Sequence, residues 1–434
     1  MRSIRQLRVV VAIVGLAMSA TGAQTNDTMD ELAERYVKLV LAMGQHDADY
    51  VDAYYGPEEW REASEGWDLD RIADEAGAVL SALGEAEPPP SAGQLIRLRH
   101  QYLRRQLASL QSRVRILNGQ ALAFDDESSA LYDAVAPTNS AAYFEEALSA
   151  LDRALPGNGT VIDRYQQFRR DFVIPPDRLD GVFEAAIAEC RRRTVEHVEL
   201  PADESFTVEY VTDKSWSGYN WYQGGFRSLI QVNTDLPIYI DRAIDLACHE
   251  GYPGHHVYNV LLERHLVRDR GWPEFSVYAL FSPQSLIAEG TANYGIDVVF
   301  DQTERLAFER DTLFPAAGLD ASRVEEYYEV QALVAQLDYA GNEAARRYLN
   351  GEIDRAAAAD YLTRYAMMAP DRAEQRTRFF DQYRSYVINY NLGKDLVADY
   401  VERQSGGTQD NRWEAFAELL ASPRLPSGLR EDTR

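Results

Sequence analysis

Three of the seven histidines lie within one short segment, directly beside a glutamate. The segment His249–His256 reads HEGYPGHH. Neutral imidazoles bind Zn²⁺, and a carboxylate beside one of them can accept a proton from a water that the metal acidifies. The usual arrangement is H-E-x-x-H, in which histidines four positions apart share one helical face. These residue types therefore indicate a metal site, although their spacing differs from the usual one.

A regular helix would not bring His249 to either of the later histidines. On an ideal helix, position i+6 is rotated by about 240° and displaced by about 9 Å, and position i+7 lies about 10.5 Å along the axis. Pro253 lacks an N–H and its ring collides with the carbonyl of His249, while Gly254 permits a turn. We therefore predict a bulge or break that returns His255 to the face of His249. His256 would then point elsewhere in the cleft or into the core, and it remains the alternative ligand.

A third ligand is expected downstream, in the helical pattern after Pro283. Glu289 lies there among apolar neighbours, namely Leu286, Ile287, Ala288 and Ala292. A carboxylate in such surroundings is costly to bury without a metal or a cation. We therefore expect one Zn²⁺ ion bound by His249, His255 and Glu289, with Glu250 as the general base. The alternative is a cluster of histidines with a structural or surface role.

Two motifs make the chain resemble the bacterial "domain of unknown function 885" family of zincin-like metallopeptidases. The family signature is H-E-x-x-P-G-H followed by an E-G-x-x-x-Y helix, and the chain has HEGYPGH at 249–255 and EGTANY at 289–294. Weaker likenesses are FRSLIQVNT at 226–234, YNLG at 390–393 and DAYYGP at 52–57. The resemblance implies a mainly α-helical zincin-like fold, in which His249, His255 and Glu289 bind zinc and Glu250 is the base.

The chain departs from the pattern of this family at two positions near the third ligand. Thr291 stands where the family usually has Trp, and Ile296 stands where an acid is often found. Both departures leave the expected metal ligands intact. They therefore concern substrate preference rather than metal binding.

A donor is also needed to stabilise the oxyanion that forms when a carbonyl is attacked. The candidates are Tyr390, Tyr386 and His256, of which we favour Tyr390. With these residues the sequence predicts a zinc-dependent metallopeptidase that hydrolyses peptide bonds. The alternatives are a zinc hydrolase of non-peptide amides and an exported zinc-binding pseudoenzyme or binding protein.

Other residues are expected to hold the substrate, which would be a peptide or a small amide. The strand 228–233 is expected to align an extended peptide by backbone pairing, as edge strands do. Asn233 and Tyr294 are possible accessory residues of the site. Arg227 or Arg384 is expected to bind a substrate carboxylate.

The elements that must position these residues are mainly helices, with one region of strands. Apolar periodicity and helix-stop signals predict helices at 29–43, 94–117, 180–198, 322–350, 372–404 and 416–420, with a tail from Pro423. A capping box at Ser322–Glu325 is expected to begin the fourth of these helices. Short alternating runs at 207–212 and 228–233, joined by an aromatic and Gly-rich loop at 216–225, predict a hairpin or small sheet near the active site.

The N-terminus predicts export. Arg2, Arg5 and Arg8 precede the apolar run Val9–Met18, and small residues follow at 21–23, so residues 1–23 are expected to be a signal peptide. The mature protein would have no membrane span and would be periplasmic or secreted. We expect a helical N-terminal region at 24–200 and a metallopeptidase-like region at 201–434, which together form one continuous helical unit.

Charge and cysteine content narrow the remaining classes of function and the expected covalent structure. The formal charge is −25, which disfavours binding to nucleic acid and to anionic membranes. The two cysteines, Cys190 and Cys248, are interpreted as separate small buried residues rather than as a disulfide.

Overall fold

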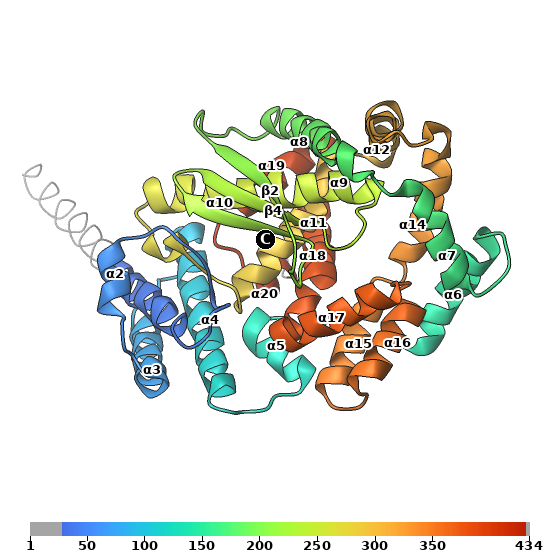
Figure 1. The fold of residues 1–434 in the computed structure, drawn as a ribbon. Coiled ribbons are helices and arrows are strands. Elements are labelled where there is room, and N and C mark those ends of the chain that lie inside the picture. The colour runs from blue at the N-terminus through green and yellow to red at the C-terminus, as the bar shows by residue number, and fades with distance from the viewer. Residues whose placement is uncertain (1–27, 431–434) are drawn as a thin grey trace, which may run out of the picture.

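Helices surround one small sheet in the computed structural model of the chain, which describes residues 28–430 (Figure 1). The predicted mainly α fold class is thus confirmed. The first helix covers residues 28–43. The others are α2 (Glu58–Ala63), α3 (Leu69–Glu85), α4 (Gln94–Leu117), α5 (Phe124–Tyr132), α6 (Ala141–Ala154), α7 (Val161–Arg169), α8 (Leu179–Val195), α9 (Ile240–Leu246), α10 (His255–Leu262), α11 (Pro283–Val299), α12 (Gln302–Phe308), α13 (Phe314–Ala317), α14 (Val324–Ala335), α15 (Ala340–Leu349), α16 (Arg355–Tyr365), α17 (Pro370–Tyr383), α18 (Ile388–Ser405), α19 (Gln409–Leu420) and α20 (Pro426–Arg430).

The small sheet has three strands in the order β2-β4-β3. Strand β4 (Arg227–Asn233) is central, parallel to β2 (Ser205–Val211) and antiparallel to β3 (Gly218–Gly224). The predicted small sheet is confirmed, but the expected loop at 216–225 is wrong. Its side chains alternate between buried Asn220 and Tyr222 and exposed Trp221, which is the period of a strand. The expectation that 228–233 is an edge strand is also wrong, because both of its edges are paired. A two-stranded ribbon of β1 (Val51–Tyr54) and β5 (Val277–Ala279) was not predicted.

The predicted helices are confirmed in part. The helix α4 has the predicted bounds, because a continuous apolar stripe faces the core. The predicted helix 322–350 is two helices, α14 and α15, and it does not begin with the expected capping box. Asp320 accepts a hydrogen bond from the Ser322 N–H instead, ahead of a 3₁₀ turn. The predicted tail contains α20.

The predicted helix 372–404 is also divided in two. Arg384 has a φ of +51°, and a 3₁₀ turn over Arg384–Val387 separates α17 from α18. The buried carboxylate of Glu127 holds this turn, since it accepts hydrogen bonds from Arg384 Nε at 2.7 Å and Ser385 Oγ at 2.6 Å. A long-range contact therefore interrupts a helical pattern that is continuous in the sequence.

Two helices pack backbone to backbone at the centre of the core. A Cβ at Gly290 of α11 would lie 2.4 Å from the Gly393 carbonyl oxygen of α18, and a Cβ at Gly393 would lie 2.7 Å from the Leu286 oxygen. One hydrophobic cluster extends from Met29 to Leu429. The division of the chain at residue 200 stays a prediction.

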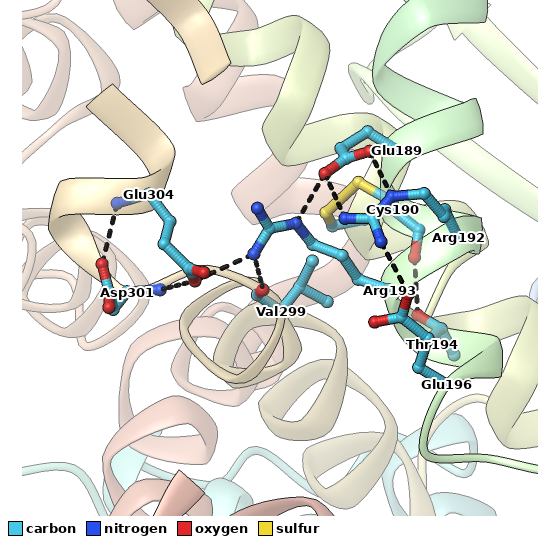
Figure 2. Close-up of polar contacts among 10 residues, drawn as sticks. Glu189, Cys190, Arg192, Arg193, Thr194, Glu196, Val299, Asp301 and Glu304 are labelled. Atoms are coloured by element: carbon cyan, nitrogen blue, oxygen red, sulfur yellow. Dashed lines mark hydrogen bonds and ion pairs between the residues drawn. A yellow bond between two sulfur atoms is a disulfide. The ribbon is translucent and has the colours of Figure 1, made fainter. Parts of the chain in front are cut away.

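A disulfide ties α8 to the segment that carries His249. Cys190 and Cys248 are bonded, with their Cα atoms 5.8 Å apart, so the expectation of two separate cysteines is wrong. Both are fully buried as expected, but their proximity comes from tertiary packing. Figure 2 shows that Arg193, on the same stretch of α8, pairs with Glu304 of α12 at 2.8 Å and donates to the Val299 carbonyl at the end of α11 at 3.3 Å. The helix α8 thus anchors two elements of the site.

The predicted signal peptide at 1–23 lies outside the described residues. Among residues 28–430, none of the helices combines the length and apolarity needed to cross a bilayer.

Candidate metal centre

The segment HEGYPGH changes its backbone conformation twice. After α9 the chain makes a π-helical turn over Ala247–Gly251, breaks at Tyr252–Gly254 and resumes as α10 at His255. Gly254 makes the break possible, because a Cβ there would lie 1.8 Å from the His249 carbonyl oxygen. The predicted interruption is confirmed, and π-helical turns of this kind often occur at functional sites.

Three side-chain atoms converge beyond this break. His255 Nε2 lies 3.1 Å from His249 Nε2, and Glu289 Oε2 lies 3.4 Å from His249 Nε2 and 3.8 Å from His255 Nε2. In a tetrahedral zinc site with ligands about 2.1 Å from the ion, neighbouring ligand atoms lie about 3.4 Å apart. Glu289 Oε2 is buried and has no hydrogen-bond partner among the described residues. The spacing and the unpartnered oxygen therefore fit a metal ion held by these three residues.

Neighbouring side chains orient two of the three atoms. Asn293 Oδ1 lies 3.1 Å from His249 Nδ1, so an N–H at that nitrogen leaves Nε2 free to bind a metal. Tyr386 donates its hydroxyl to Glu289 Oε1 at 2.8 Å, which turns Oε2 toward the histidines. Sequence reasoning missed Asn293, although its position four residues after Glu289 places it on the same face of α11.

Glu250 lies beside the cluster and is buried. Its Oε1 is 3.9 Å from His249 Nε2, and Asn220 of β3 donates to its backbone carbonyl at 2.7 Å. Gly218 of β3 leaves room for this carboxylate, since a Cβ there would lie 2.8 Å from Glu250 Oε1. The strand β3 thus bounds the space next to Glu250, the expected base.

Burial and mutual charge set the protonation of the cluster. Burial raises the pKa of Glu250 to about 7 and lowers the pKa of His255 to about 4. Burial also opposes the charged forms of the other two groups, but the charge of Glu250 raises the pKa of His249, and the proximity of His249 and His255 lowers the pKa of Glu289. At neutral pH His255 is therefore neutral and Glu289 ionised, which are the forms that bind a metal.

His256 points away from the cluster into the core. Its Nδ1 lies 2.9 Å from Ser228 Oγ, and its Nε2 lies 2.9 Å from Glu204 Oε2. All three residues are buried, and Tyr252 and Arg191 also donate to Glu204. The structure therefore brings His255, rather than His256, to His249 and Glu289.

The other residues singled out in the sequence have different positions. Tyr390 lines the cavity next to the cluster, and Tyr386 contacts Glu289 as described. Asn233 lies outside this cavity and donates to the carbonyls of Lys214 and Trp216, so it fixes a loop at the cavity rim. Tyr294 donates to Glu402 at 2.9 Å, away from the cluster.

The two arginines proposed for a substrate carboxylate do not line the cavity. Arg384 binds Glu127, and Arg227 is an exposed residue of β4, so this expectation is wrong. The arginines that do line the cavity are Arg242, Arg372 and Arg376. The last two belong to one face of α17, which sequence reasoning missed. The signal was present as the spacing of Arg372, Arg376 and Phe379 on that helix.

The cluster opens on a cavity of about 370 Å³. Its wall combines residues of β1, β3, α9, α11, α17 and α18, which come from both halves of the chain. A pocket of this size with a few converging polar groups is typical of a small-ligand or active site. The arrangement can therefore hold a metal and admit a small substrate to it.

No family model and no curated protein matches the chain, so the resemblance to the domain of unknown function 885 family stays a prediction. Solved structures do match it. A provisionally assigned lipoprotein of Colwellia psychrerythraea has a TM-score of 0.50 at 14% identity, over 86% of this chain and 64% of that one. The two proteins share a fold, and this chain spans less than two thirds of the Colwellia protein.

Two further structures are less similar. A provisionally assigned lipoprotein of unknown function from Shewanella oneidensis has a TM-score of 0.45 at 12% identity, over 87% of this chain and 78% of that one. Metallocarboxypeptidase 1 of Trypanosoma cruzi has a TM-score of 0.43 at 12% identity, over 93% of this chain and 91% of that one.

Proposed function

We propose that the protein is an exported zinc-dependent metallopeptidase that hydrolyses amide bonds of small peptides. The observation that carries the proposal is the buried carboxylate of Glu250 beside the converging atoms of His249, His255 and Glu289. A purely structural zinc site is closed by four protein ligands and needs no base. Among the described residues this cluster has three such groups, and it opens on a cavity.

Each residue has a distinct role in this proposal. His249, His255 and Glu289 would hold the zinc, which supplies a Lewis acid that acidifies a water and polarises a carbonyl. Glu250 takes the proton of the attacking water and passes it to the leaving nitrogen. The hydroxyl of Tyr390, which lines the same cavity, donates to the oxyanion.

The strand nearest to the cluster gives a place for the substrate backbone. Gly218, Tyr219 and Asn220 of β3 line the cavity, and β3 is an edge strand of the sheet. An extended peptide would pair with this edge rather than with the central strand β4.

The disulfide supports the export part of the proposal. Disulfides persist in oxidising compartments and are rare in the bacterial cytosol. The bond between Cys190 and Cys248 therefore agrees with the signal peptide expected at 1–23, and with a periplasmic or secreted protein.

The test compares zinc content and peptide cleavage in the wild type and in Glu250→Gln. We expect the variant to keep its zinc and to lose activity by about 10²-fold or more, because only the proton transfer is removed. The exposed Glu329→Gln on α14 is the control and should behave as the wild type. Equal turnover by Glu250→Gln, or full activity after chelation of the metal, would refute the proposal.

A further inference from the structure

Two arginines in the cavity have no carboxylate partner in the part of the chain that the structure describes. Arg376 forms no ion pair there, its Nε is buried without a hydrogen-bond acceptor, and its guanidinium lies 4.3 Å from the Phe379 ring centroid. Arg372 donates only to neutral groups, Ser217 Oγ and Gln375 Oε1, each at 2.6 Å. Neither guanidinium therefore forms an ion pair with a carboxylate of the described residues.

The buried Arg99 and Arg346 each have a carboxylate partner. Arg99 binds Glu274 at 2.6 Å with both side chains buried, and Arg346 binds Glu343 at 2.6 Å. Arg372 and Arg376 are half-buried, so each guanidinium loses part of its hydration without gaining an ion pair among the described residues, although the chain has many more acids than bases. Their place in the cavity wall indicates that an anion from outside the chain binds and neutralises them.

Neighbouring charges point the same way. Burial and the positive charges of Arg242 and Arg376 together lower the pKa of Arg372 to about 10. Arg242 also lines the cavity, and its nearest carboxylate, Asp245, is 3.7 Å away and binds Arg305 more closely. The wall formed by α9 and α17 is thus an electropositive surface to which a carboxylate would bind.

The arginines lie a short contact chain away from the expected zinc ligands. The guanidinium of Arg376 is 5.6 Å from the Tyr390 ring centroid, and the Tyr390 ring is 5.8 Å from the Tyr386 ring. The Tyr386 hydroxyl in turn binds Glu289. Arg376 and the expected zinc ligands therefore line one cavity and are linked by successive side-chain contacts.

We infer that Arg372 and Arg376 bind the free C-terminal carboxylate of the substrate, so that the enzyme removes residues from peptide C-termini. The inference rests on the proposed function, because it assigns the substrate of the same site. Arginine suits this role because its planar guanidinium binds a carboxylate through two parallel hydrogen bonds.

The experiment compares one acetylated pentapeptide as the free acid and as the C-terminal amide, with products identified by mass spectrometry. We expect the wild type to release C-terminal residues from the acid and to cut the amide at least about 30-fold more slowly. Arg376→Gln should lose this preference mainly through KM. Arg378→Gln, an exposed neighbour on α17, should keep it. Equal cleavage of acid and amide, or release from the N-terminus, would overturn the inference.

A binding measurement separates this inference from the proposed function. Zinc-loaded Glu250→Gln should bind the free acid at least about 30-fold more tightly than the amide by calorimetry, and adding Arg376→Gln or Arg372→Gln should abolish the difference. If the wild type cuts neither peptide but this preference remains, the carboxylate site stands and the peptidase proposal fails. If the wild type cuts both peptides equally and binding shows no preference, the carboxylate site fails and the peptidase proposal stands.

Discussion

Single side chains outside the metal cluster fix the orientation of the atoms inside it. Asn293 selects the tautomer of His249, and the Tyr386 hydroxyl occupies one oxygen of Glu289 so that the other faces the histidines. Groups of this kind typically change metal affinity by about 10- to 100-fold when they are removed. The two adjacent histidines show the same principle, because their neighbours give them opposite roles.

Substitution of these two histidines should therefore have different consequences. His255→Ala removes one of three converging atoms, so we expect zinc affinity to fall by at least about 100-fold with little change in the stability of the metal-free protein. His256→Ala leaves Glu204 buried without one of its partners, so we expect a loss of about 3 kcal/mol in unfolding free energy. Zinc competition assays and urea unfolding of the chelated proteins measure both effects. Loss of zinc binding in His256→Ala, with binding retained in His255→Ala, would reverse the assignment.

At the scale of elements, α11 and α18 are held together by glycine. Gly393→Ala would place a Cβ 2.7 Å from the Leu286 carbonyl oxygen, so we expect the helices to separate and stability to fall by about 1–3 kcal/mol. Gly84→Ala in α3 is the control, because a Cβ there would have no other atom within 4 Å and alanine favours a helix by about 0.5–1 kcal/mol. Thermal unfolding of both variants checks the prediction. A Gly393→Ala protein as stable as the wild type would show that the close packing is not needed.

The disulfide is the second element-scale constraint on the site. It closes a loop over a separation of 58 residues, so we expect the Cys190→Ser/Cys248→Ser variant to lose about 4 kcal/mol of unfolding free energy. Zinc affinity should fall as well, because Cys248 precedes His249. Urea unfolding with and without reductant measures the effect. Reductant should weaken the wild type and leave the double variant unchanged, and a wild type that is insensitive once its thiols are shown to be free would contradict this account.

Local patterns in the sequence were sufficient for part of this architecture. The stripe of α4 and the break at Pro253-Gly254 depend on neighbours within a few residues, so both were predictable. The position of Glu289 among apolar residues gave a physical reason to expect a partner for it. The structure then brings its carboxylate to His249 and His255.

The features that were missed depend on contacts between distant segments. Cys190 and Cys248 meet because α8 packs against the π-helical turn, and Glu127 interrupts the helix at Arg384. The same limit explains the choice of the wrong arginines. Among many arginines, only the tertiary structure shows that Arg384 has a carboxylate partner and that Arg376 has none within residues 28–430.

At the scale of the whole molecule, the net charge is negative, but one wall of the cavity is positively charged. The chain carries 69 acidic and 44 basic side chains, yet α17 presents arginines to the cavity. A negative surface around an electropositive wall would slow the approach of anionic substrates while the wall binds them once they enter. The buried carboxyl groups also differ in charge, because the folded protein favours the ionised form of Glu204 and the protonated form of Glu309.

These two buried glutamates predict opposite contributions to the pH dependence of stability. Burial raises the pKa of Glu309 to about 7, from 4.5, so its contribution is present below pH 4.5 and is lost as pH rises toward 7. Burial opposes the charge of Glu204 too, but hydrogen bonds from His256, Tyr252 and Arg191 lower its pKa to about 2, so its contribution is lost as pH falls from 4.5.

Urea unfolding at pH 5, 6 and 7 isolates the contribution of Glu309. Relative to Glu309→Gln, the wild type should lose up to about 1.4 kcal/mol of unfolding free energy per pH unit, because the folded state holds a proton that the unfolded state releases. Glu204→Gln is the control, since Glu204 is ionised in both states over this range and the difference from wild type should be constant. Glu309 lies on the π-helical segment after α12, outside the cavity, so zinc should not alter the result. A constant difference between the wild type and Glu309→Gln from pH 5 to 7 would show that Glu309 is ionised in the folded protein throughout.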